Sequence, residues 1–285
     1  MQRCSMNNCP VVLVHGWKSH PGVWKRLALR LEERGIPAWK FDHSGMRDES
    51  APAVAAALQG YIRTMREESD HAGAIDIVCH SMGTLATRYL LEVMDGSART
   101  ERVRNLIGIG PPNNGSSMAE LFNDPVHGPG IRRLLAGTFV PHGYRPAEDA
   151  IVQDLRPGSR VVAALRAAGI RDDIRYRVIM SANHAAASGF FPLFEGKTWV
   201  FASDGTWETT YAGDGIIPHA DSYLPGAGYD ILPLDPVLLH REPDTYCHLR
   251  LPGNPEVIER ILEYVTNPAT RPSGFFPEGE EGTRK

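Results

Sequence analysis

The sequence predicts an α/β fold, in which a mostly parallel central sheet carries helices on both faces. Two observations favour it. Short apolar runs alternate along the chain with longer segments whose apolar residues recur every three or four positions, which is the order of strands and helices in a parallel sheet. The first run, residues 11–14 (VVLV), is apolar throughout, as expected of a strand buried on both faces.

The helices alternate with these strands. Residues 23–34 carry apolar side chains at four-residue spacing and end at Gly35, which predicts the first helix. A second helix is expected after the start signals Ser50 and Pro52, and a last helix over residues 257–265. The strands are expected at residues 11–14, 38–41, 75–78, 106–109 and 174–180.

The most informative motif is residues 79–83 (CHSMG), between the apolar run 75–78 and a helical pattern. It predicts a tight strand-to-helix turn, which strains the backbone of Ser81 and exposes its hydroxyl at a helix N-terminus. Small residues are needed two positions before and after the serine, because strand and helix approach closely there. Gly83 meets this requirement, whereas Cys79 stands where glycine is usual.

A second motif, residues 15–17 (HGW), follows the first strand. With the motif around Ser81, it resembles the α/β-hydrolase superfamily, specifically its bacterial and archaeal lipase-like serine esterases. The resemblance covers about residues 10–266. Residues 110–116 (GPPNNGS) resemble a loop of many lipases. Dehalogenases and epoxide hydrolases carry an aspartate as the nucleophile on the strand-to-helix turn, so Ser81 separates the chain from these two classes of enzyme.

The resemblance also implies an acid and a histidine, in that order after the nucleophile. Asp214, in residues 213–218 (GDGIIP), is similar to the acid loop of the family, and His248 precedes the family's last helix. Other residues of the same type compete for these roles: Asp204, which begins another Asp-Gly pair, and His184, His219 and His240.

This resemblance implies a carboxylic ester hydrolase that works through an acyl-enzyme without a cofactor. His248 would accept the proton of Ser81, and Asp214 would hold the imidazole in the required tautomer. The backbone N–H groups of Trp17 and Met82 would form the oxyanion hole. Two alternatives stay open at this point: an acyltransferase on the same scaffold, and a catalytically inactive binding protein.

The domain organisation expected is a single α/β-hydrolase domain over residues 10–266 with two insertions. Residues 118–169 mix apolar residues with glycine and proline, as either a mobile lid or a fixed cap would. Residues 185–212 are rich in aromatics and include a predicted β-hairpin around an Asp-Gly turn. The tail, residues 268–285, is expected to be disordered.

Composition restricts the function classes and partners. The 285 residues are 42% hydrophobic and 22% charged with a formal net charge of −4, so no basic patch favours nucleic acid. No apolar stretch is long enough for a transmembrane segment, and no signal peptide is recognisable, so we expect a cytoplasmic protein, with a mature secreted form as the alternative. The expected partner is a small-molecule ester or lipid, with transient contact to a lipid interface, and the oligomeric state stays open.

A catalytic metal is not expected, and a bound structural ion stays open. Several related lipases carry calcium or zinc near the acid and histidine loops, but the available side chains have no diagnostic ligand spacing. These side chains are Asp221, Asp230, Asp235 and His219.

Overall fold

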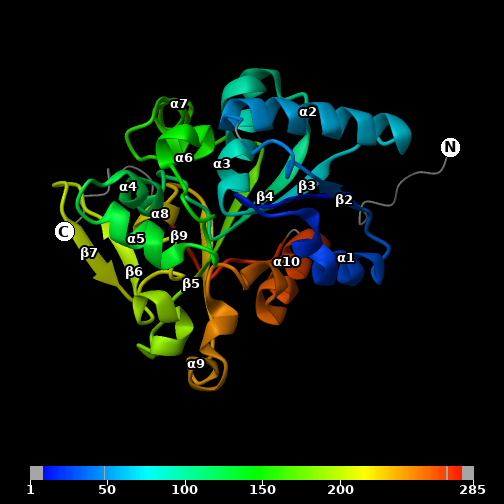
Figure 1. Ribbon diagram of the computed structural model, residues 1–285. Helices are drawn as coiled ribbons and strands as arrows, with labels where there is room; N and C mark the ends of the chain where they lie inside the picture. Colours follow the sequence, from blue (N-terminus) through cyan, green and yellow to red (C-terminus); the bar gives the residue numbers. More distant parts are fainter. Residues whose placement is uncertain (1–8, 48, 268, 278–285) are drawn as a thin grey trace.

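The computed structural model describes residues 9–47, 49–267 and 269–277. Within these residues, seven strands form the central sheet in the order β2-β1-β3-β4-β5-β8-β9 (Figure 1). All neighbours pair in parallel except β8 and β9. The α/β fold with a mostly parallel sheet is therefore confirmed. The strands are β1 (Val11–Val14), β2 (Ala38–Phe41), β3 (Ile75–His80), β4 (Val103–Ile109), β5 (Arg175–Ser181), β8 (Gly228–Leu232) and β9 (Gly274–Phe275).

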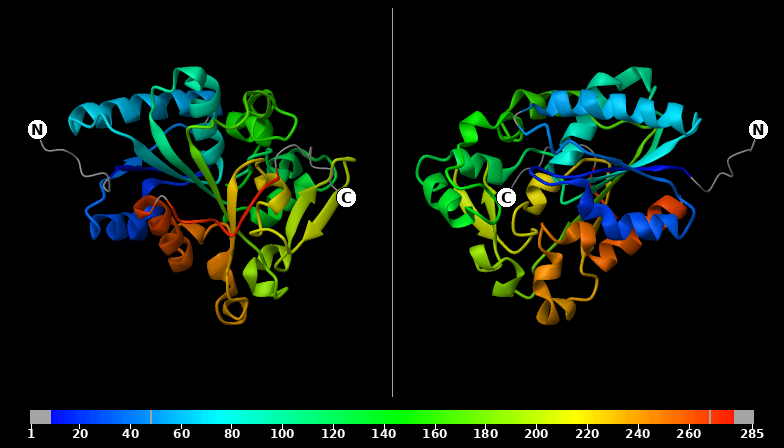
Figure 2. Two further views of the ribbon diagram at one scale, coloured as in Figure 1. Left: turned by 180° about the vertical axis from the view of Figure 1, so that it is seen from behind. Right: turned by 45° about the vertical axis from the view of Figure 1, so that its right-hand side comes forward.

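Helices cover both faces of this sheet, as Figures 1 and 2 show. One face carries α1 (Lys25–Glu32) and α10 (Pro255–Thr266), and the other carries α2 (Ala51–Glu68) and α3 (Met82–Arg88). Their local sequence explains their boundaries. Ser50 caps α2 by accepting a hydrogen bond from the Ala53 N–H at 3.3 Å, and Pro52 occupies its first turn.

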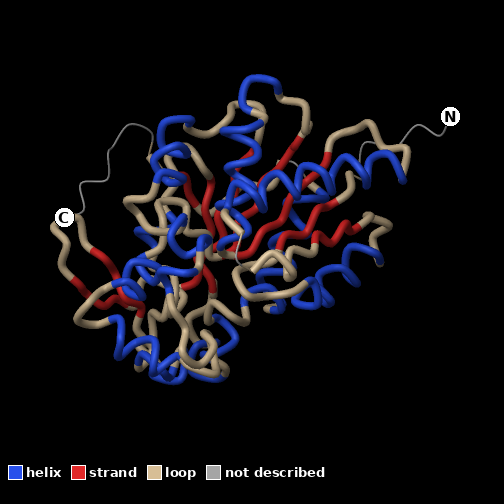
Figure 3. Tube along the Cα trace, turned by 45° about the horizontal axis from the view of Figure 1, so that its top comes forward, coloured by secondary structure: helices blue, strands red, loops and turns tan. Residues whose placement is uncertain are grey.

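The register of the strands brings their carboxyl ends to one edge of the sheet. Val14 of β1 is opposite Cys79 of β3, and His80 is opposite Ile109 of β4. The loops that follow these strands therefore begin side by side, which is where open α/β sheets bind ligands. Figure 3 shows the strands of the central sheet running through the middle of the molecule, with helices around them.

The two segments expected as insertions, residues 118–169 and 185–212, form structures of their own, and we keep the names first and second insertion for them. Residues 117–169 contain four α-helices and a short 3₁₀ helix, Pro146–Glu148. The predicted hairpin within residues 185–212 is confirmed, since β6 (Thr198–Phe201) pairs antiparallel with β7 (Trp207–Thr210). Three phenylalanines of the second insertion, Phe190, Phe191 and Phe194, are buried in the core. The helices of the first are α4 (Ser117–Asn123), α5 (Gly128–Leu135), α6 (Ala150–Asp154) and α7 (Arg160–Ala168), and two short helices follow later, α8 (His219–Ser222) and α9 (Leu238–Arg241).

The tail corrects one expectation. Residues 274–275 were expected in a disordered segment, but they form β9, where Phe275 is opposite Gly228 of β8. The ring of Phe276 packs 4.7 Å from that of Tyr229. The prediction is wrong for this part because β8 would otherwise be an edge strand, whose unpaired backbone groups can bind even a two-residue strand. Residues 268 and 278–285 lie outside the described residues.

In the described ranges, no helix has both the length and the apolar character needed to cross a bilayer.

Candidate active site

Ser81 lies on the predicted turn between β3 and α3. Its backbone adopts φ 53° and ψ −129°, a conformation that a residue with a side chain rarely adopts. A hydrogen bond of 2.9 Å from the Ser81 N–H to the Ile109 carbonyl holds the turn against β4. A Cβ atom on Gly83 would lie 2.6 Å from the His15 carbonyl oxygen, so only glycine lets the helix approach β1 this closely.

Cys79, the departure from the usual motif, fits at the other small position. Its side chain is completely buried and its Sγ lies 3.2 Å from the Thr87 hydroxyl of α3. Burial raises the pKa of the Cys79 thiol to about 12, so the thiol stays protonated at neutral pH. Cys79 therefore fills space between strand and helix and supplies no second nucleophile.

The structure brings Ser81, His248 and Asp214 together, although they are far apart in sequence. His248 Nε2 lies 2.9 Å from Ser81 Oγ, and His248 Nδ1 lies 2.6 Å from Asp214 Oδ2. A carboxylate only accepts, so the hydrogen of the neutral imidazole is on Nδ1 and Nε2 is free to accept from the Ser81 hydroxyl. The other oxygen of Asp214 accepts the N–H groups of Ile216 and Ile217, at 3.0 and 2.6 Å.

The competing residues are engaged elsewhere or exposed. The His219 ring nitrogen Nε2 lies 2.9 Å from the Ser181 carbonyl, to which it donates a hydrogen bond. Asp204 lies in the exposed turn of the β6–β7 hairpin, where it accepts from the Thr206 N–H. Ser81 is hydrogen-bonded by His248 and not by His219.

Gly110 is a site residue whose role the sequence did not indicate. It follows β4 with φ +52°, and a Cβ atom there would lie 2.6 Å from Asp214 Oδ2 and 3.0 Å from His248 Nδ1. The main chain at Gly110 thus packs directly against the hydrogen bond between Asp214 and His248. The available signal in the sequence was a glycine immediately after a buried strand. The need for glycine becomes clear only in the folded chain, where the loops that carry Asp214 and His248 lie against Gly110.

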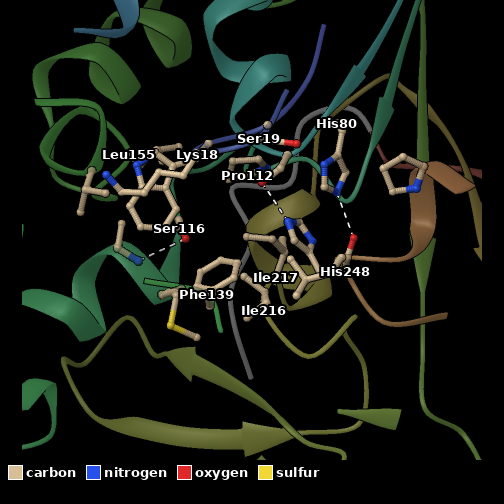
Figure 4. Close-up of a pocket in the computed structure, with 18 of the residues that line it drawn as sticks. Lys18, Ser19, His80, Pro112, Ser116, Phe139, Leu155, Ile216, Ile217 and His248 are labelled. Carbon is tan, nitrogen blue, oxygen red and sulfur yellow. Dashed lines mark hydrogen bonds between the residues drawn. The ribbon is translucent and has the colours of Figure 1, made fainter. Parts of the chain in front are cut away.

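His80 is a second site residue whose role the motif at residues 79–83 did not indicate. Its Nε2 lies 3.0 Å from the His248 carbonyl oxygen, and the two rings are 4.6 Å apart (Figure 4). Burial, and to a smaller degree the neighbouring His248, lower the pKa of His80 well below its ordinary value, so His80 is neutral. It donates its Nε2 hydrogen to the main chain of His248 and helps to fix that loop.

The loop of residues 15–17 lies against the turn at Ser81. A Cβ atom on Gly16 would be 3.1 Å from Ser81 Cβ. His43 holds this loop from the other side: its ring Nε2 donates to the His15 carbonyl at 2.9 Å, and its backbone N–H donates to His15 Nε2 at 3.3 Å. Burial, together with His15, lowers the pKa of His43 to about 4, so the pair is neutral at physiological pH.

A cavity of about 320 Å³ opens beside Ser81 and His248 (Figure 4). Ile216 and Ile217 of the acid loop line it, as do Trp17 and Lys18 of the loop after β1. Among the described residues, none of the second insertion, residues 185–212, lines the cavity. The first insertion supplies much of its apolar surface: Met118, Ala119, Phe122, Phe139, Val152 and Leu155.

Comparison with known proteins identifies the fold. A lipase from Bacillus licheniformis in its mature form superposes with a TM-score of 0.64 at 17% identity, covering 93% of this chain and 95% of the lipase. The chain has the α/β-hydrolase fold. A metagenomic carboxyl esterase gives a TM-score of 0.58 at 20% identity over 92% of this chain and 76% of the esterase. The phospholipase PlaB from Legionella pneumophila gives 0.60 at 13% identity over 91% of this chain, which spans only 64% of the phospholipase.

Sequence comparison adds little to this α/β-hydrolase assignment. Residues 11–124 match a family model described as a domain of unknown function, DUF7379. No curated protein matches the chain. The matched segment contains β1 to β4 and the turn at Ser81, but it ends before Asp214 and His248.

Acidic residues that the sequence offered as metal ligands have other partners in the structure. Asp221 accepts the N–H and the hydroxyl of Ser117, at 2.5 and 3.0 Å. Asp230 binds Arg260 at 2.8 Å and also the Tyr264 hydroxyl. In the part of the chain that the structure describes, no group of three His, Cys, Asp or Glu side chains could hold a metal ion.

Proposed function

We propose that the protein is a serine carboxylic ester hydrolase with Ser81 as nucleophile, His248 as base and Asp214 as the acid that orients it. One observation carries the proposal: the continuous hydrogen-bonded chain from Ser81 Oγ through His248 to Asp214, with 2.9 and 2.6 Å between its members. A serine hydroxyl becomes an effective nucleophile only when a neutral imidazole accepts its proton, and this geometry supplies one.

Acylation begins when Ser81 Oγ attacks the ester carbonyl and its proton passes to His248 Nε2. Asp214 stabilises the imidazolium, and the tetrahedral oxyanion is bound by the main-chain N–H groups of Trp17 and Met82. Met82 is the first residue of α3, so its N–H has no partner within the helix and meets the positive end of the helix dipole. His248 then protonates the departing alcohol, and the acyl group remains on Ser81.

Deacylation repeats these steps with water. His248 takes a proton from a water molecule, which attacks the acyl carbonyl, and the proton is returned to Ser81 Oγ as the carboxylic acid leaves. No step needs a cofactor or a metal ion. The apolar lining of the cavity suits an acyl chain, so the substrate class is a small-molecule ester or a lipid ester.

The function is tested by p-nitrophenyl esters from acetate to palmitate, with and without an added primary alcohol. We expect release of p-nitrophenol with a carboxylic acid as the main product, and a preferred chain length that separates esterase from lipase behaviour. The acid arises because water reaches the acyl-enzyme, and it is measured by mass spectrometry of the products.

Two other outcomes would contradict the hydrolase. If a new ester of the added alcohol is the main product, the protein is an acyltransferase that uses the same acyl-enzyme. If the folded protein releases p-nitrophenol from none of the esters, the proposal is wrong, and the result favours a catalytically inactive binding protein.

A further inference from the structure

Asp149 is a buried carboxylate outside the proposed Ser81, His248 and Asp214 set. It is only 4% exposed and is the N-cap residue of α6 in the first insertion. Its Oδ1 accepts the Val152 N–H at 3.2 Å, which is an ordinary helix cap. The cap uses one oxygen of the carboxylate and leaves the other for partners elsewhere.

The second oxygen of Asp149 interacts with three donors, and two of them belong to consecutive residues of the loop after β1. Asp149 Oδ2 lies 3.1 Å from the Trp17 indole Nε1, 3.2 Å from Lys18 Nζ and 3.2 Å from the Tyr144 hydroxyl. Burial, and then the charge of Asp149, raise the pKa of Tyr144, so its hydroxyl stays protonated and donates. We call Trp17, Lys18, Tyr144 and Asp149 the Asp149 cluster.

The backbone at this point needs such support. Lys18 adopts φ 49°, in the left-handed region that disfavours residues with a Cβ atom. The Lys18 ammonium lies 4.8 Å from the centre of the Trp17 ring, and that ring packs 5.6 Å from Phe139. The turn after β1 is therefore held by side chains of the insertion as well as by its own main chain.

We infer that Asp149 is a positioning residue that fixes the main chain at Trp17 and Lys18, so that the Trp17 N–H faces the oxyanion formed at Ser81. This inference rests on the proposed function. Asp149 touches no reacting atom and acts through Trp17. The first insertion, which lines the cavity, thereby also positions one of the two proposed oxyanion donors.

The test compares Asp149→Ala and Asp149→Asn with Asp154→Ala. Asp154 is a matched control because it ends the same helix and also ties it to the core, where its Oδ2 accepts the Ala51 N–H of α2 at 2.8 Å. In Asp149→Asn, the new amide side chain keeps a carbonyl acceptor for the cap or the indole but loses the charge that holds Lys18. This variant keeps the test informative if the alanine variant unfolds.

Two readouts are needed. The first is the rate of amide hydrogen exchange at residues 16–19, which reports how stable the conformation of this loop is and needs no substrate. These residues include the hydrogen bond of the turn, from the Ser19 N–H to the Gly16 carbonyl at 3.3 Å. For Asp149→Ala we expect exchange there to accelerate about tenfold or more and kcat to fall about 10- to 100-fold with KM nearly unchanged, since an oxyanion donor acts in the transition state. Asp149→Asn should fall between, and Asp154→Ala should change neither quantity.

The outcomes separate this inference from the proposed function. Unchanged exchange at residues 16–19 in both Asp149 variants, or equal acceleration in Asp154→Ala, would overturn the positioning role whatever the activity. Accelerated exchange with unchanged kcat would show that Asp149 holds the loop but does not set the oxyanion hole, and would also overturn it. If the native protein hydrolyses no ester, the proposed function fails, and the exchange data alone decide whether Asp149 holds the loop.

Discussion

Replacing Ser81 by alanine is expected to lower kcat for p-nitrophenyl esters by ~10³-fold or more, because the variant cannot form the acyl-enzyme. The free energy of unfolding should change by less than about 1 kcal/mol, since alanine keeps the Cβ atom and the strained backbone and only one hydrogen bond is lost. Initial rates and thermal denaturation of the two proteins at equal folded concentration provide the measurement.

The control for Ser81→Ala is Ser97→Ala, an exposed serine on the short turn Gly96–Ala98 that does not line the cavity. It should keep native activity. Ester hydrolysis that survives in folded Ser81→Ala would mean that another group attacks the carbonyl, and the mechanism proposed here would be wrong.

Replacing Asp214 by asparagine is expected to reduce kcat by ~10⁴-fold, provided that the variant folds, because the amide favours the wrong tautomer of the imidazole. An amide NH₂ facing His248 Nδ1 would donate, so the hydrogen of the ring would move to Nε2 and face the Ser81 hydroxyl. The remaining amide oxygen can still accept the N–H groups of Ile216 and Ile217, which now bind Asp214 Oδ1. Steady-state kinetics at neutral pH, with circular dichroism to establish folding, give the measurement.

Asp204→Asn is the matched control, because Asp204 also precedes a glycine but lies in the exposed hairpin turn. It should leave kcat within about threefold of the native value, as exposed substitutions usually do. A large loss of activity in Asp204→Asn, with Asp214→Asn close to native, would contradict the assignment of Asp214 as the acid and assign that role to Asp204.

Local patterns in the sequence were sufficient for five strands of the central sheet, β1 to β5, and for the turn at Ser81, but they did not predict β8 or β9. The strand at residues 38–41 was predicted with the bounds observed for β2, and the turn at Ser81 was predicted from one glycine and the change from strand to helix periodicity. The acid and the histidine followed from the family resemblance. Their hydrogen bonds agree with that expectation, and their catalytic roles stay a proposal.

The parts that the sequence did not predict all depend on contacts between distant segments. Gly110 matters because Asp214 and His248 arrive beside it from loops far along the chain. Asp149 reads locally as a helix cap, and only the folded chain shows that its other oxygen binds Trp17 and Lys18. β9 was missed because the tail was judged by its content of proline, glycine and glutamate, which indicates only how little apolar surface it can bury. The two residues of β9 are held instead by backbone pairing with β8, which would otherwise be an edge strand.

The measurement that tests the central claim most directly is covalent labelling by a fluorophosphonate, followed by mass spectrometry of the intact and digested protein. We expect one adduct per chain on the peptide that contains Ser81, no adduct in Ser81→Ala, and much slower labelling in His248→Ala, because the base activates the hydroxyl. A folded native protein that is not labelled, or an adduct that persists in Ser81→Ala, would contradict the assignment of Ser81 as the nucleophile.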